Sequence, residues 1–345
     1  MQVTRARTLK ELAERLGVSV TTVSRALAGH EQIARKTRER VSEAAREMGY
    51  VPNIAGRQLV SGRSNFVGFI IPLRGPNFMD SYLGEFVTGL GEGLVSHGID
   101  LILATVQQGQ SELEVLRHLV ESGRADGVVI PRIAAHDERV RYLAQHNFPF
   151  VAHGRIEDDD IVYSWLDADG EKAFENAFEL LYGLGHRHFG MVSISEEMTF
   201  RNLRERGFKR AMERIGDPGL RLDIVRAPRF DRGETVSAIG RLLDAPDRPT
   251  AIVGLFDEIA LTIIREAARR ELSIPRDLSV VGFDNITAAA YAPPGLTTFE
   301  VETRSMAREI AHMLVRRIEG EPAGLSNTLI RPRLVERASH GPAPQ

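Results

Sequence analysis

The amino-acid sequence predicts an α/β protein in which a small all-α head precedes a larger body of parallel β-sheets flanked by helices. Two observations predict this fold. Apolar residues recur at helical spacing in short segments over residues 8–48, and beyond residue 65 apolar runs typical of buried strands alternate with helical stretches. With 345 residues, 43% of them hydrophobic, the chain is long enough for two or three domains with sizeable cores.

The first two helices are predicted within residues 8–27. Thr8 precedes the first apolar residues and Glu11 stands three positions later, which is the pattern of a capping box. Gly17 ends this helix, and the hydroxyl of Ser19 is placed to start a second one. The second helix would bury Val23, Ala26 and Leu27. Two short helices joined by a glycine-containing turn form a helix-turn-helix.

The second helix carries side chains suited to reading DNA. Val20, Thr21 and Arg25 fall near its N-terminus on the outward side, where a recognition helix meets base edges in the major groove. Arg25 can donate two hydrogen bonds to a guanine, Thr21 can donate or accept, and Val20 can contact a thymine methyl. Short polar groups suited to phosphates accompany them: Ser19, Thr22 and Ser24. The alternative is an ordinary helical hairpin with a solvated arginine.

The charge distribution favours a nucleic-acid partner for the head. The whole chain has a net charge of −3, but residues 1–62 hold eleven Lys and Arg against six Glu, which leaves about −8 for the remainder. The sequence has no cysteine, and no segment approaches the ~20 apolar residues of a membrane span. We therefore expect a cytoplasmic, nucleoid-associated protein without membrane contact.

A third helix and a tether follow the helix-turn-helix. The spacing predicts a helix over Thr37–Met48, with its apolar face inward. In residues 52–64, Asn53 can cap a short turn of about seven residues that contains Gly56. So short a segment cannot hold a helix alone in water, which predicts a flexible tether. Leu59 is an unusual large apolar residue in such a tether.

The body alternates strands and helices. Predicted strands are FVGFIIPL, IDLILATV, ADGVVIP, FPFVAH, HFGMVSI, a segment near Leu222–Val225, TAIVG and LSVVGF. Predicted helices lie at Asp80–His97, Glu112–Ser122, Asp137–His146, Glu171–Gly183, Leu203–Ile215, Glu234–Leu243 and Asp257–Arg270. This alternation predicts parallel sheets with helices on both faces, and so many units indicate two lobes.

The chain resembles the LacI/GalR family of bacterial transcription regulators. The head and hinge of that family are similar to TLKELAERLGVSVTTVSRALAG, TRERVSEAAREMGYVPN and GRQLVSGRS. Its periplasmic-binding-protein-like core is similar to the body through ADGVVI, LGHRHFGMV, IPRDLSVVGFDN and PGLTT. The resemblance implies a head at 1–51, a hinge at 52–64, a two-lobed core at 65–338 and a tail at 339–345. It implies lobe crossings near Asp167, Leu296 and Asn327, with an N-lobe of 65–167 and 297–326 and a C-lobe of 168–296 and 327–338.

The resemblance also implies how the hinge acts. In the family the hinge folds into a helix on operator DNA, and a leucine wedges into the minor groove. Leu59 occupies that place, and an apolar wedge unstacks a base step and bends the duplex. Tyr50 and Asn53 join the expected DNA contacts. Two departures matter: Gly56 replaces a usual alanine and weakens the hinge helix by ~1 kcal/mol, and Ala34 replaces a usual serine, so the third helix loses its side-chain cap.

A ligand between the lobes is implied, outside the carboxyl ends of the strands. Arg204 stands three residues before the glycine of RERGF, as the family's effector-binding arginine does. Asp284 directly follows the strand LSVVGF and matches the family's effector-contacting aspartate. A carboxylate there can accept from two hydroxyls. The alternative for Asp284 is a cap on a helix at Ile286–Ala290.

Three phenylalanines complete the expected effector site. Phe78 and Phe230 lie in loops after strands, where aromatic faces can stack on sugar rings or purines, and a place in the core is the alternative for each. Phe256 replaces a usual asparagine that bonds the ligand, so it would supply stacking or fill the pocket. Gly170 likewise stands where an asparagine is usual. The effector is therefore not expected to be one of the family's best-known ligands.

We predict a sequence-specific repressor that binds palindromic operator DNA as a homodimer under control of a small molecule, a sugar or sugar derivative. The tail has no leucine heptads, which favours a dimer over a tetramer. The alternatives are a corepressor-dependent regulator, or a small-molecule-binding protein whose head mediates protein contacts. No catalytic constellation or phosphate loop is present, and His186 and His188 lack a third ligand, so we expect neither an enzyme nor a metal or cofactor.

Overall fold

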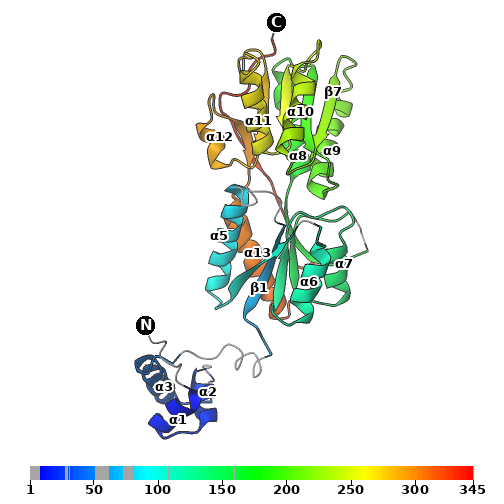
Figure 1. The fold of residues 1–345 in the computed structure, drawn as a ribbon. Coiled ribbons are helices and arrows are strands. Elements are labelled where there is room, and N and C mark those ends of the chain that lie inside the picture. The colour runs from blue at the N-terminus through cyan, green and yellow to red at the C-terminus, as the bar shows by residue number, and fades with distance from the viewer. Residues whose placement is uncertain are drawn as a thin grey trace. The chain divides into compact units, whose positions relative to one another are not determined.

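The computed structural model describes residues 8–27, 30, 32–50, 62–72, 81–107, 109–157 and 160–344. The chain divides into two compact units, Met1–Ser64 and Asn65–Gln345, which are the helical head and the α/β body (Figure 1). Among the described residues, no helix has the length and apolar character needed to span a membrane. The predicted fold class is confirmed: a helical head and two parallel α/β sheets.

The head consists of helices α1 (Leu9–Leu16), α2 (Val20–Leu27) and α3 (Arg35–Glu47). They enclose a small core in which Leu12, Val23 and Val41 are fully buried. Since these residues come from the three helices in turn, each helix depends on the other two for burial of its apolar face.

The helix ends of the head have the chemistry that the sequence predicts. Thr8 and Glu11 form a reciprocal capping box, in which each backbone N–H donates to the other residue's side chain. Gly17 ends α1 in the left-handed conformation, with a φ of 66°. Ser19 Oγ accepts from the backbone N–H of Thr22 at 3.0 Å. Ala34 precedes α3 without a side-chain cap, as expected.

The body contains two six-stranded sheets in its described residues, one for each lobe. The N-lobe sheet has the order β11-β5-β4-β3-β1-β2, and its pairings are parallel. Its strands are β1 (Phe66–Pro72), β2 (Asp100–Val106), β3 (Gly127–Ile130), β4 (Phe150–His153), β5 (Ser164–Ala168) and β11 (Thr328–Ile330). Its helices are α5 (Ser81–Val95), α6 (Glu112–Glu121), α7 (Glu138–Gln145) and α13 (Thr303–Ile318).

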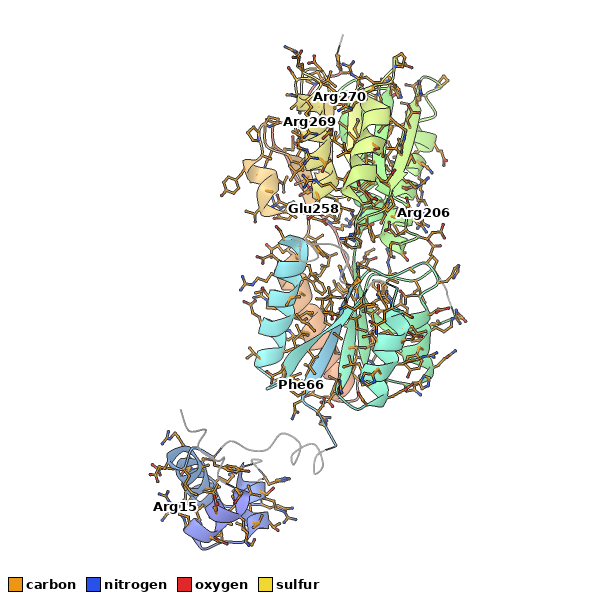
Figure 2. All side chains as sticks on the ribbon, in the orientation of Figure 1. Arg15, Phe66, Arg206, Glu258, Arg269 and Arg270 are labelled. Atoms are coloured by element: carbon orange, nitrogen blue, oxygen red, sulfur yellow. The ribbon has the colours of Figure 1, made fainter. Side chains whose placement is uncertain are left out.

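The C-lobe sheet has the order β12-β10-β9-β8-β6-β7. Its strands are β6 (His188–Ile194), β7 (Arg221–Ala227), β8 (Ala251–Gly254), β9 (Ser279–Phe283), β10 (Thr297–Glu300) and β12 (Arg333–Val335), and β12 runs antiparallel to β10. Its helices are α8 (Gly170–Gly183), α9 (Thr199–Ile215), α10 (Arg232–Leu243), α11 (Asp257–Ala268) and α12 (Thr287–Tyr291). Arg270, which is labelled in Figure 2, lies just after α11. It forms an ion pair at 2.6 Å with Asp244, which lies just after α10.

Strand pairing places the second and third lobe crossings a few residues beyond the positions given from the sequence. The first crossing follows β5, close to Asp167 as predicted. The second was placed near Leu296, but β10 still pairs with β9 in the C-lobe, so the chain crosses only after Glu300. The third was placed near Asn327, but β11 pairs with β5 in the N-lobe, so this crossing follows Ile330. The predicted lobe boundaries shift accordingly.

The long helix α13 was not predicted, although it fills much of the N-lobe core. It packs along α5 (Figure 1). A Cβ on Gly89 of α5 would lie 2.3 Å from the backbone oxygen of Arg304, and one on Gly93 would lie 2.6 Å from the Cβ of Ala311. The two glycines therefore let the helices approach more closely than any larger residue would allow.

Candidate functional site

The predicted base-reading residues of the head lie together on the exposed side of α2. Val20, Thr21 and Arg25 are all exposed, while Val23 and Ala26 on the opposite side are buried. Thr21 and Arg25 are one helical turn apart and so share a face. This arrangement leaves the face of α2 that carries Thr21 and Arg25 exposed, as contact with a groove of DNA would require.

The predicted phosphate-contacting groups differ in their surroundings. The hydroxyl of Ser19 lies 2.8 Å from that of Thr22, so both belong to the cap of α2. Ser24 is partly buried, and Tyr50 packs against the head core. Asn53 and Leu59 lie outside the described residues.

A pocket lies between the two lobes of the body, at the carboxyl ends of strands from both sheets. Of the predicted effector residues, Arg204, Phe230, Phe256 and Asp284 all line it. Phe78 lies outside the described residues. Four predicted residues that are far apart in the sequence thus meet in one cavity, as the rule for open α/β sheets requires.

Arg204 is the most buried cation of the pocket, with 8% of its surface exposed. Its Nη1 donates to the backbone oxygen of Leu255 at 2.5 Å, and its guanidinium carbon lies 3.7 Å from the ring centroid of Phe283. Its Nε is buried without a hydrogen-bond partner in the described chain. Burial lowers the pKa of this guanidinium, and the negative charge of Asp284 is the largest effect opposing that shift.

Asp284 follows β9 in a left-handed conformation, with a φ of 112°. The next helix, α12, begins at Thr287, and its N-cap residue Ile286 supplies no side-chain cap. The backbone N–H of Ile286 donates to Asp257 at 2.9 Å, and Thr298 Oγ1 donates to the same carboxylate at 2.5 Å. Burial raises the pKa of Asp257 to about 8, and the charge of Asp284 adds to the shift.

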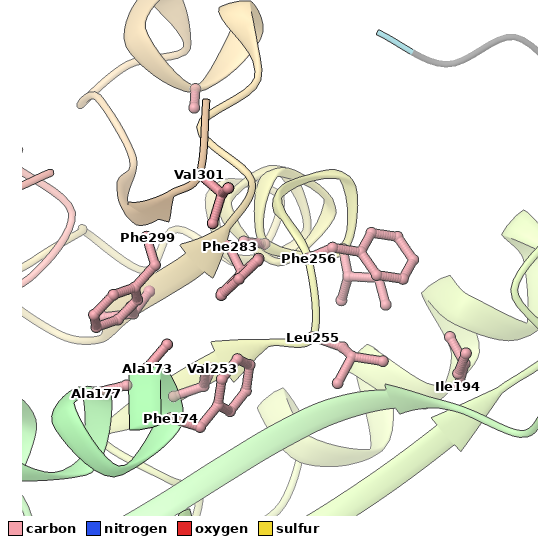
Figure 3. Packing of buried hydrophobic residues seen from close by; sticks show 14 of the residues in the cluster. Ala173, Phe174, Ala177, Ile194, Val253, Leu255, Phe256, Phe283, Phe299 and Val301 are labelled. Carbon is pink, nitrogen blue, oxygen red and sulfur yellow. The ribbon is translucent and has the colours of Figure 1, made fainter. Parts of the chain in front are cut away.

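Phe256 both lines the pocket and belongs to the hydrophobic core of the body. It lies near Phe283 where the C-lobe strands end (Figure 3). The guanidinium carbon of Arg229 lies 5.0 Å from the Phe256 ring centroid and 5.6 Å from that of Phe230. Phe230 is 38% exposed, so its ring lies at the mouth of the pocket. Phe256 is buried, so its ring forms part of the pocket wall.

The N-lobe contributes a neutral hydrogen-bonded pair that was not predicted from the sequence. Tyr82 of α5 places its hydroxyl 3.3 Å from Nε2 of His153 at the end of β4. Burial raises the pKa of Tyr82 well above its ordinary value and lowers that of His153 to about 4. Both groups are therefore uncharged at neutral pH.

Of the pocket residues that were not predicted, His153 could have been identified from its position in the sequence. His153 ends a predicted strand, the same kind of position that singled out Asp284. Asp167 lines the pocket from β5, where it accepts from Nε of Arg155 at 2.9 Å, but β5 itself was not predicted. Tyr82 stands in a helix and carried no such signal.

His186 and His188 are held by local hydrogen bonds. His186 lies 2.8 Å from Thr250 Oγ1 and 3.1 Å from Ser279 Oγ, and His188 lies 2.8 Å from Asp223. Within the described residues, no group of three or more His, Cys, Asp or Glu side chains is arranged to hold a metal ion.

Comparison with known sequences places both units of the chain in one family. Residues 8–53 match the model of the lacI family of bacterial regulatory proteins, and residues 178–340 match a periplasmic binding protein-like domain. The HTH-type transcriptional regulator AglR of Rhizobium meliloti (strain 1021) is 34% identical over 97% of this chain and 95% of its own length. The regulator CelR of Thermobifida fusca is 31% identical over 98% of this chain and 100% of its own.

Solved structures have the same fold. A complex of the regulator CelR with cellobiose has a TM-score of 0.70 and 28% identity, covering 96% of this chain and 99% of that one. The lac repressor dimer bound to operator and the anti-inducer ONPF has a TM-score of 0.82 at 22% identity, covering 97% and 99%, which shows a common fold. The chain thus belongs to the lacI family: it is a DNA-binding transcription regulator with a periplasmic-binding-protein-like core, and not an enzyme.

Proposed function

We propose that this regulator is a repressor that binds a palindromic operator as a homodimer and releases it when a sugar or sugar derivative enters the pocket. The observation that carries the proposal is the convergence of Arg204, Asp284 and aromatic rings in a cavity lined by both lobes. A ligand that touches both lobes stabilises whichever lobe arrangement it binds more tightly. The CelR relative solved with cellobiose and the lac repressor dimer solved on operator support this assignment.

Each predicted residue has a role in this proposal. Arg204 and Asp284 would orient the ligand through its polar groups, while Phe230 and Phe256 would cover its apolar faces. In the hinge, the apolar Leu59 would wedge into the minor groove with Asn53 nearby. Ligand binding would change whether the hinges order on DNA, which is an order–disorder switch.

Replacing the arginine of α2 tests the assignment of the reading residues. We expect Arg25→Ala to reduce the preference for the operator over a scrambled duplex by about 10- to 100-fold, because a bidentate contact to guanine is worth about 1–3 kcal/mol. The residual binding should still fall steeply with salt. Fluorescence anisotropy with both duplexes at several salt concentrations measures this.

Arg46→Ala is the matched control, since it also removes one exposed positive charge from the head. The Arg46→Ala variant should bind the operator and the scrambled duplex more weakly by the same factor. Its preference for the operator should therefore be unchanged. A wild-type protein without preference for any palindrome would contradict the proposal. Titrating the ligand into the operator complex then shows whether the ligand is an inducer or a corepressor. Release of the operator DNA indicates an inducer, and tighter binding of the DNA indicates a corepressor.

A further inference from the structure

Arg204 is a buried cation whose charge is not neutralised by a contact. Among the described residues no carboxylate forms an ion pair with it, and Asp284 acts on it only at longer range. Within the part of the chain that the structure describes, Nη1 is its only nitrogen atom with a hydrogen bond, which it donates to the backbone oxygen of Leu255. Burying an arginine in this way is costly unless another group completes its hydrogen bonds. The atoms without partners are the Nε–Nη2 edge, the edge that binds a carboxylate side-on.

The surroundings of that edge are suited to a planar group. The guanidinium face is covered by Phe283 at 3.7 Å, with Phe200 at 5.1 Å, so hydrogen bonding is directed into the plane of the guanidinium. Gly170, the first residue of α8, also lines the pocket. A Cβ at this position would lie 3.2 Å from Nε of Arg204 and 3.1 Å from its Cγ. A glycine at position 170 therefore places no side chain of its own against Nε, where any larger residue would press on Arg204.

The rest of the pocket favours an anion that also carries hydroxyl groups. Arg132, Arg155 and Arg229 line the pocket with Arg204, against the carboxylates of Asp167 and Asp284 among the described lining residues. Asp167 is already paired with Arg155, and Arg132 lies 3.6 Å from Glu112, so the net charge of the lining rests on Arg204 and Arg229 against Asp284. Tyr82 and His153 add neutral donors and acceptors. This lining combines an excess of positive charge with acceptors for hydroxyls.

We propose that the effector is a sugar acid, a hydroxylated ring or chain bearing a carboxylate, and that its carboxylate is bound side-on by Nε and Nη2 of Arg204 beside Gly170. This rests on the proposed function, because it names the ligand of the same pocket. The carboxylate completes the two hydrogen bonds that the protein leaves open and neutralises the buried charge. The hydroxyl groups are left to Asp284 and the Tyr82–His153 pair.

Matched ligands test the charge directly on the full-length protein. The probes are glucuronate, its neutral isostere glucuronamide and glucose, followed by the same series built on galactose. We expect the acids to raise the melting temperature and to bind at least tenfold more tightly than the amides in calorimetry. Equal or tighter binding of the amides or neutral sugars overturns the inference. Binding of glucose 6-phosphate but of neither acid overturns it as well, because the anion is then not a carboxylate.

Two variants locate the contact. Arg204→Gln keeps hydrogen bonding but removes the charge, and it should abolish the difference between acid and amide. Gly170→Asn places an amide against Nε and should weaken the acid by at least tenfold while retaining the melting temperature of the free protein within a few degrees. If the acid binds Gly170→Asn as tightly as wild type, the contact is elsewhere and the inference fails.

Different outcomes would contradict the ligand class and the proposed function. If neutral sugars bind and weaken operator binding while the acids do not bind, the regulator is sugar-responsive and only the ligand class is wrong. If no sugar, sugar acid or sugar phosphate binds, both fail.

Discussion

At the scale of single residues, His153 makes the body sensitive to acid. Its imidazole packs against the rings of both Tyr82 and Phe86, with ring centroids at 6.2 and 5.0 Å, and burial lowers its pKa from 6.5 to about 4. The unfolded chain therefore binds this proton more readily than the folded one. Stability from this group is complete above pH 6.5 and is lost as the pH falls toward 4, by on the order of 3 kcal/mol in total.

Urea unfolding between pH 7 and 4.5 measures this loss. We expect His153→Asn, which cannot take up a proton, to lose less stability over that range than the wild type. His118→Asn is the control, because it makes the same substitution at a histidine that is exposed on α6. Parallel profiles for wild type and His153→Asn would show that the imidazole is not held neutral.

The residue scale also shows what sequence could and could not predict of the site. Arg204 and Asp284 were found from motif position, and both line the pocket. Tyr82 was not found, because its role depends on α5 placing it against His153 from a distant part of the chain. Sequence position along one strand or helix can be read locally, whereas a contact between elements depends on packing.

At the scale of elements, the close contact between α5 and α13 depends on glycines of α5. We expect Gly89→Ala to destabilise the body by about 1–3 kcal/mol, because its Cβ would meet the backbone oxygen of Arg304 rather than a side chain that can move. Gly91→Ala is the matched control on the same helix, since its Cβ meets nothing within 4 Å. That variant should be more stable than wild type by up to about 1 kcal/mol. Thermal unfolding of the two variants checks the sign of each change.

The sequence did not predict the strands β5, β10, β11 and β12 or the helix α13. The strands β11 and β12 have three residues each, which is too short for any periodicity to appear. Helix α13 is different, because buried Met306, Ile310 and Leu314 recur at intervals of four and a helix was readable there. The strand–helix alternation predicted the sheets, but only pairing partners reveal where the chain crosses between the lobes.

At the scale of the whole molecule, head and body have separate hydrophobic cores. We expect two unfolding transitions in calorimetry of the protein without DNA. Thr8→Ala, which removes the capping box of α1, should lower only the head transition, by about 1 kcal/mol. Gly89→Ala should lower only the body transition. A single transition shifted by both variants would mean that the two units unfold together.

One backbone hydrogen bond of the body joins the two lobes and can report on the distance between them. The N–H of Thr199, the first residue of α9, donates to the backbone oxygen of Ile133 in the N-lobe at 2.9 Å, and Ala134 and Met198 form a β-bridge beside it. Met198 itself supplies no side-chain cap. The helix that carries Arg204 is therefore capped by the opposite lobe, so drawing the lobes apart frays its first turn. Hydrogen exchange at the Thr199 amide would thus record the spacing of the lobes.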